Sequence, residues 1–294
     1  MSLQPEVLPE FEPPPPPPPA EPEPGPRLRI PHIGHALLFI SFAGMLLLSI
    51  QIALYFMGKA PAATTGGSIV VLHPKLQIVA LAATYLSTLL GAAWMFPYLW
   101  GRPFLSGIRW QWRTARNQEG RLIGLGFILG ATMQIVTYFI TPPKKLPIDE
   151  FFASASTAWL ITVFGTLVAP LFEEICFRGF LVPAFAIAYD WLSMSQTEQA
   201  RSHWQSSTTL TPLSYLFSAV LTSVIFALMH AEQVAHLWAA LTGLFCVSLV
   251  LTFVRVKTQS VAASTLVHAS YNFFVFLMVL IATGGYRHLD RMIR

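Results

Sequence analysis

The sequence predicts an all-α membrane protein, a polytopic bundle of seven or eight transmembrane helices. Of its 294 residues, 54% are hydrophobic and only 11% are charged, against roughly 25% charged in an ordinary soluble domain. The 18 basic and 14 acidic residues fall mainly in a proline-rich N-terminus, in short polar connections and near the C-terminus. The long stretches between them are apolar, as expected for helices surrounded by lipid.

Apolar runs place the individual helices. A spanning helix needs about 20 predominantly apolar residues, and seven runs meet or approach this length. In chain order they are 36–56, 76–100, 122–140, 155–189, 213–229, 237–254 and 261–282. The fourth run is too long for one straight span and contains Pro170 and Pro183. Because proline disrupts a helix interior, we expect either one broken helix or two helices there.

Composition divides the chain into four parts. They are a disordered proline-rich cytoplasmic tail (1–31), three transmembrane helices (32–150), the bundle that carries the candidate site (151–283) and a short basic tail (284–294). The first part holds 13 of the 23 prolines. Such a segment favours an extended polyproline conformation and cannot pack a core. We interpret it as a solvated tail in preference to a docking segment for a proline-binding partner.

The basic residues predict orientation. A net charge of +4 and a pI near 9.2 do not indicate a nucleic-acid partner, because these residues lie beside helix ends. We expect the most basic connection and the N-terminus to be cytoplasmic, in a multi-pass protein of the cell membrane. With seven spans Arg255 and Lys257 are also cytoplasmic, whereas with eight the C-terminus is. The most basic connection contains Arg102, Arg109, Arg113, Arg116 and Arg121.

Ionisable residues inside apolar spans are costly, so they indicate function. Here Glu173, Glu174 and Arg178 fall in one segment. In a helix, Glu174 and Arg178 share a face, where an ion pair offsets part of the burial cost. Glu173 points about 100° away and needs a different partner. A carboxylate desolvated in this way is suited to act as a general base.

Three further polar residues occur in the later apolar helices. His230 ends the run 213–229, and His268 lies in the last run with Asn272 one turn later on the same face. Unpaired, each group would cost several kcal/mol in hydrocarbon, so we expect them to converge with the two glutamates and the arginine. The alternative is a set of hydrogen bonds that only joins helices. Glu232 is expected to reach the rim of the same site.

Three motifs in order carry a family resemblance: Glu173-Glu174-x-x-x-Arg178, Phe226-x-x-x-His230 and His268-x-x-x-Asn272. They resemble the motifs of the CPBP intramembrane protease family, which includes the CAAX prenyl endopeptidases and Abi-like bacterial relatives. The resemblance covers about residues 155–282. It implies an endopeptidase that hydrolyses a bond near the membrane, in a CAAX-type prenyl peptide or another membrane-associated peptide. The implied partners are therefore a peptide or lipidated peptide and membrane lipids.

The resemblance also implies residue roles. Glu173 and His230 would activate a water that attacks the scissile carbonyl, and His268 and Asn272 would stabilise the oxyanion. No metal or other cofactor is required by this scheme. Three further motif residues would support and orient the site: Glu174, Arg178 and Phe226.

The same residues are compatible with several other functions. The Glu and His residues could form a zinc peptidase site, although the His-Glu-x-x-His signature is lacking. A cysteine protease would use Cys176 with a histidine from another helix. A transporter or a catalytically silent scaffold would use the same residues as a proton relay or as structural contacts. A peptidase needs an opening wide enough for a peptide, whereas a relay needs access from both sides.

Overall fold

The computed structural model describes residues 29–58, 73–139 and 146–292. These residues are largely helical and contain no strand. Seven helices within them are long and apolar enough to cross a membrane, which confirms the multi-pass bundle. They are α1 (Ile33–Gly58), α2 (Pro74–Trp100), α5 (Glu119–Tyr138), the segment Ala155–Ser193, α10 (Pro212–Met229), α11 (Trp238–Thr258) and α12 (Val261–Ala282). The proline-rich tail expected over 1–31 lies outside the described residues except for its last three.

The expectation of a broken helix in the fourth run is wrong. The segment runs without a break through α6 (Ala155–Val163), η2 (Phe164–Val168), α7 (Ala169–Glu174), η3 (Ile175–Leu181) and α8 (Val182–Ser193). Both η2 and η3 are π-helical, and Pro170 and Pro183 are each the second residue after one of them. A π turn accommodates a residue that cannot donate the usual amide hydrogen bond. The long helix therefore continues past both prolines by means of wider π turns.

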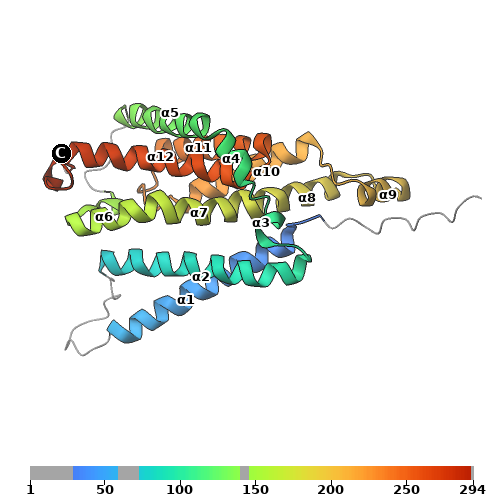
Figure 1. The fold of residues 1–294 in the computed structure, drawn as a ribbon, viewed down its shortest axis with the longest axis horizontal. Coiled ribbons are helices and arrows are strands. Elements are labelled where there is room, and N and C mark those ends of the chain that lie inside the picture. The colour runs from blue at the N-terminus through green and yellow to red at the C-terminus, as the bar shows by residue number, and fades with distance from the viewer. Residues whose placement is uncertain (1–28, 59–72, 140–145, 293–294) are drawn as a thin grey trace, which may run out of the picture.

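The long helix α6–α8 occupies the middle of the bundle. Figure 1 shows α1 and α2 on one side of it and α5, α11 and α12 on the other. A buried aromatic cluster that includes Phe39, Phe96 and Phe180 joins α1 and α2 to it. A second buried cluster, including Leu251 and Val267, joins α5, α11 and α12. The first motif is thus held between two layers of helices.

Helices α5 and α12 approach each other closely at Gly126. A Cβ atom at this position would lie 2.6 Å from the backbone oxygen of Val267 and 2.6 Å from Cβ of Ser270. Small residues allow such close backbone approach in membrane helices. The contact fixes the part of α12 that carries His268.

The two ends of the bundle differ in charge. One end, here called the basic end, contains α3 (Phe104–Gly107), α4 (Trp112–Asn117), α9 (Glu198–Ser206) and the turn between α11 and α12. The turn is tied to the arginine-rich connection, because Val261 donates its backbone N–H to Arg109 O at 3.1 Å. Arg255 and Lys257, in the last turn of α11, also lie at this end. The other end contains η1 (Pro147–Phe152), the connection between α10 and α11, and η4 (Leu289–Met292).

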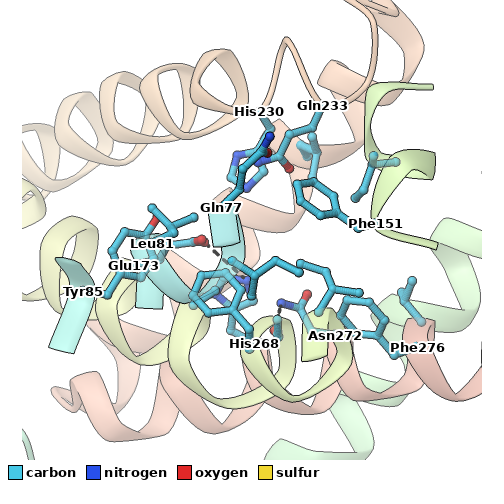
Figure 2. Close-up of a pocket in the computed structure, with 18 of the residues that line it drawn as sticks. Gln77, Leu81, Tyr85, Phe151, Glu173, His230, Gln233, His268, Asn272 and Phe276 are labelled. Atoms are coloured by element: carbon cyan, nitrogen blue, oxygen red, sulfur yellow. Dashed lines mark hydrogen bonds and ion pairs between the residues drawn. The ribbon is translucent and has the colours of Figure 1, made fainter. Parts of the chain in front are cut away.

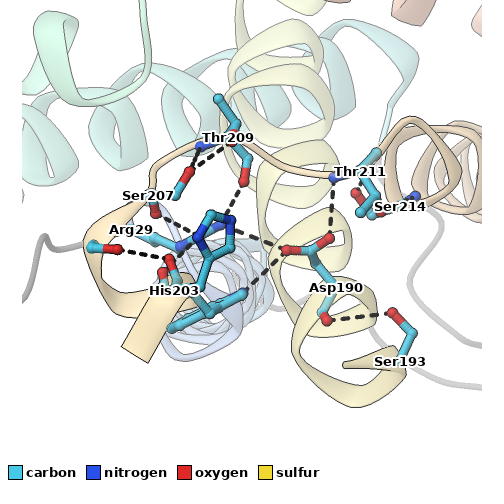
Figure 3. A network of polar contacts seen from close by, with 10 residues as sticks. Arg29, Asp190, Ser193, His203, Ser207, Thr209, Thr211 and Ser214 are labelled. Carbon is cyan, nitrogen blue, oxygen red and sulfur yellow. Dashed lines mark hydrogen bonds and ion pairs between the residues drawn. The ribbon is translucent and has the colours of Figure 1, made fainter. Parts of the chain in front are cut away.

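At the basic end Arg29 anchors the segment that precedes α1 (Figure 3). Its guanidinium donates to the backbone oxygens of Trp204 at 2.8 Å and Ser207 at 2.5 Å, and it lies 3.7 Å from the Asp190 carboxylate. Asp190 also accepts from the Thr211 backbone N–H at 3.1 Å. Burial lowers the pKa of Arg29 from its usual range, while Asp190 acts in the opposite direction. These contacts join the start of the described chain to α8 and α10.

Candidate active site

A cavity of about 590 Å³ lies in the half of the bundle away from the basic end. Glu173, His230, His268 and Asn272 all line it. Figure 2 shows these side chains around one space, although they come from α7, the end of α10 and α12. The structure therefore brings together all four residues that the sequence nominated as catalytic. We call this half of the bundle the cavity end.

The supporting pair is the most deeply buried polar contact of the site. Glu174 and Arg178 are both 0% exposed, and Arg178 Nη1 donates to Glu174 Oε1 at 2.8 Å. The second guanidinium nitrogen donates to the backbone oxygen and the hydroxyl of Ser248 at 2.9 and 2.7 Å. The two buried charges are thus paired with each other and further hydrogen-bonded, although Glu174 Oε2 and Arg178 Nε are buried without a partner.

His268 lies between the two glutamates. Its Nδ1 is 2.9 Å from Glu174 Oε1, and its Nε2 is 3.8 Å from Glu173 Oε2. A carboxylate that is paired with Arg178 can only accept, so Nδ1 must carry its proton and donate. The ring orientation is fixed by this bond, and Nε2 is directed toward Glu173 and the cavity.

His230 is oriented by the helix that it terminates. Its Nδ1 is 2.8 Å from the backbone oxygen of Phe226. Because a carbonyl accepts, Nδ1 carries the proton, and Nε2 is the nitrogen left to accept a hydrogen bond. The Phe226 ring, 1% exposed, lies 4.6 Å from the His230 ring and 5.1 Å from the Arg178 guanidinium. Phe226 therefore packs between the second motif and the buried ion pair.

Asn272 is held by the first π segment. Its Nδ2 donates to the Gly165 backbone oxygen in η2 at 2.7 Å. The side chain is half-buried and faces the cavity. An amide nitrogen has two hydrogens, so one donor remains beyond this contact.

The cavity also contains polar residues that the sequence did not nominate. Gln77, Tyr85 and Gln233 line it, and the Tyr85 ring stacks on Phe172 at 3.8 Å. A glutamine inside an apolar run was a usable signal for Gln77, whereas nothing in the sequence marked Tyr85. Glu232 does not reach the rim. It is 87% exposed, and Oε1 lies 3.4 Å from Nε2 of His236.

The positions of these side chains also bear on the zinc-peptidase and cysteine-protease alternatives. Within the described residues no group of three His, Cys, Asp or Glu side chains is placed to hold a metal ion. Glu174 is already engaged by Arg178 and His268, so it does not fit a ligand role. Cys176 is buried and is not among the residues that line the cavity. Residues 174–181, which continue the long helix toward the basic end, are all buried.

Comparison with known proteins gives one family match. Residues 155–274 match the model of the type II CAAX prenyl endopeptidase Rce1-like family. All three motifs lie within the matched residues, so the resemblance inferred from them is confirmed. The match supports a CAAX-type intramembrane endopeptidase in general. No curated protein and no solved structure matches the chain.

Proposed function

Since residues 155–274 carry the Rce1-like match, we propose that the chain is an intramembrane endopeptidase that uses a water activated by Glu173 and His230. The observation that supports this most is the convergence of three separate motifs on one cavity. Polar contacts that only join helices would not need an open space of about 590 Å³ beside Glu173 and two histidines.

In the proposed reaction Glu173 takes a proton from the water as its oxygen attacks the scissile carbonyl carbon. Nε2 of His230 accepts the second hydrogen bond of the same water and orients it. The carbonyl π electrons move to oxygen and form an oxyanion. When the tetrahedral intermediate collapses, the C–N bond breaks and the proton on Glu173 passes to the leaving amine.

His268 and Asn272 are the proposed oxyanion donors. Nδ1 of His268 is committed to Glu174, so a donor role for Nε2 requires the ring to carry both protons. The second amide hydrogen of Asn272 would supply the other bond. Preoriented donors in a low-dielectric cavity are among the largest contributions to catalysis. Glu174 and Arg178 act indirectly, by holding the His268 ring.

This scheme needs no metal, and we propose that the enzyme works without one. A zinc site that recruited Glu174 would have to take it from Arg178 and His268, which would leave a buried charge without its partner. The other candidate ligands, Glu173 and Nε2 of His230 and of His268, are not placed to hold a metal ion together in the described residues.

The charge of the two ends supports an orientation in the cell membrane. The positive-inside rule places the basic end, and with it the N-terminus, on the cytoplasmic side. The cavity then lies in the half toward the opposite side of the membrane. This favours a membrane-associated peptide presented from that side over a prenylated tail presented from the cytoplasm. Apolar residues such as Leu81, Phe151 and Phe276 in the cavity wall suit a lipidated or apolar peptide.

Single cysteines test the orientation in intact cells. Cysteine would replace the exposed residues Arg113 and Glu232, on a background with Cys176 and Cys246 changed to alanine. An impermeant maleimide should label Glu232→Cys and leave Arg113→Cys unlabelled until the cells are opened. The reverse pattern would place the cavity on the cytoplasmic side and restore the prenylated tail as the favoured substrate.

Cleavage by the purified chain tests the activity. A farnesylated CAAX peptide and a mixed peptide library would be offered to wild type, Glu173→Gln and His230→Ala, with and without a chelator. Glu232→Gln and His236→Ala are matched controls, because both residues are exposed beside the site. We expect wild type and both controls to cleave in the presence of chelator and both site variants to be inactive. Cleavage by Glu173→Gln would contradict the proposal, and loss on chelation would favour zinc.

A further inference from the structure

A second pocket, of about 420 Å³, lies at the basic end. Four arginines line it, and no aspartate or glutamate is among its lining residues. It is separate from the cavity, because residues 174–181 of the long helix are buried between Glu173, which lines the cavity, and Pro183, which lines the pocket. The four arginines are Arg29, Arg102, Arg109 and Arg255.

Arg255 has the most unusual environment of the four. It is only 6% exposed, yet it makes no hydrogen bond or ion pair with any described residue, and its Nε is buried without a partner. Buried arginines are normally paired, because an uncompensated charge is costly to remove from water. Its charge is the feature of this pocket that calls for an anionic ligand.

Two neighbouring arginines have their side chains held in place beside it. Arg109 donates through Nη1 to Oε1 of Gln259, in the turn that follows α11. Arg29 is anchored by Asp190 and by backbone oxygens, but its Nε is also buried without a partner. The pocket thus has no carboxylate in its wall, and of its arginines Arg29 shares its charge with Asp190, which lies outside the lining.

We propose that this pocket binds a phosphate group, with Arg255 as the principal donor and Arg109 and Arg29 beside it. The planar donor fork of arginine matches phosphate oxygens. The favoured source is the headgroup of an anionic phospholipid, because basic pockets between helices at the cytoplasmic side bind such headgroups. Val182, Ile187 and Leu210 add apolar surface to the wall, which suits the glycerol and first acyl carbons.

Ligand-dependent unfolding of the full chain in a neutral detergent tests this site. The probes are short-chain phosphatidylglycerol, short-chain phosphatidylcholine and inorganic phosphate, added to wild type, Arg255→Met and Arg201→Gln. Arg201 is a matched control, because it is exposed at the same end and lies outside the pocket. We expect phosphatidylglycerol to raise the Tm of wild type and of Arg201→Gln. In Arg255→Met its apparent affinity should fall roughly tenfold to a hundredfold.

The outcomes separate a ligand site from a structural role. Arg255→Met should unfold at the same or a higher Tm than wild type without ligand, because it removes an unpaired buried charge. If inorganic phosphate reproduces the rise, the site takes a soluble phosphate; if only phosphatidylglycerol does, it takes the lipid. The proposal is wrong if no phosphate probe raises the Tm of wild type, if Arg255→Met keeps the full response, or if phosphatidylcholine acts equally well on both proteins.

Discussion

Two buried arginines of this bundle differ in what surrounds them. Arg178, near the cavity, is 0% exposed and bonds to Glu174 and to two oxygens of Ser248. Arg255, at the basic end, is 6% exposed and has no bonded partner among the described residues. Both terminal nitrogens of the Arg178 guanidinium are bonded, although its Nε is buried without a partner, so its role is to hold other groups in place. The second is unsatisfied, so its charge is available to a ligand.

The contrast extends to the neighbours of each arginine. Beside the cavity, Glu174 is held by Arg178 and bonds to Nδ1 of His268, which fixes the His268 ring toward Glu173. At the basic end, Arg255 shares its pocket with three further arginines. Burial alone therefore does not distinguish a structural charge from a binding charge. The terminal guanidinium nitrogens do, because those of Arg178 are bonded and those of Arg255 have no partner among the described residues.

The largest expected effect is on stability, from Arg178→Met. This change leaves Glu174 as an uncompensated charge in the interior, which typically costs about 3–5 kcal/mol. The free energy of unfolding in detergent should fall by this amount.

Arg255→Met is the internal control for Arg178→Met. It removes the same charge from a similarly buried position, but it strands no partner, so the unfolding free energy should stay equal or rise. An equal loss of unfolding free energy in both variants would show that Arg178 and Arg255 have the same structural role.

Next in size is the loss of an oxyanion donor in Asn272→Ala. Removing one such donor typically lowers kcat by about 10²–10³, or about 2.7–4 kcal/mol. KM for the cleaved peptide should change little, because the bond is made mainly in the transition state. Thr265→Ala, on the same helix and outside the cavity lining, should keep its kcat. A change in KM alone would assign Asn272 to substrate binding.

Much of the fold was predictable because lipid restricts what a span can contain. The seven apolar runs correspond to the seven helices, and Glu173, His230 and His268 were conspicuous because charge is rare in such runs. The π turns before Pro170 and Pro183 were not predictable. Proline indicates a local disruption, but packing on both sides of the long helix decides whether the helix breaks or widens.

The basic pocket could not be predicted from the sequence. Arg102, Arg109 and Arg255 lie beside helix ends, where the positive-inside rule already accounts for them. Only the fold shows that Arg255 turns inward and that Arg29, from the expected tail, joins the same pocket. Likewise, Glu232 and Gln233 are adjacent in sequence, and the local chain direction after α10 sends only the second into the cavity.

A smaller effect is expected at the contact that positions α12. Gly126→Ala places a methyl group against the Val267 backbone oxygen, and overpacking of this kind costs about 1–3 kcal/mol. Gly124→Ala, two residues earlier and with open space around its Cβ position, should not reduce the unfolding free energy. If both variants unfold alike, α5 does not fix the helix that carries His268.

The smallest effect is expected from Arg29→Gln, in the segment that precedes α1. Arg29 lies 3.7 Å from Asp190 and donates to backbone oxygens, yet it also lines the basic pocket, so it is intermediate between Arg178 and Arg255. Loss of its anchor should cost about 1 kcal/mol of unfolding free energy, because the pair is long at 3.7 Å and Asp190 keeps its bonds from Trp204 Nε1 and the Thr211 N–H. The response to phosphatidylglycerol should weaken less than in Arg255→Met. A full loss of that response in Arg29→Gln alone would make Arg29 the principal donor and Arg255 its neighbour.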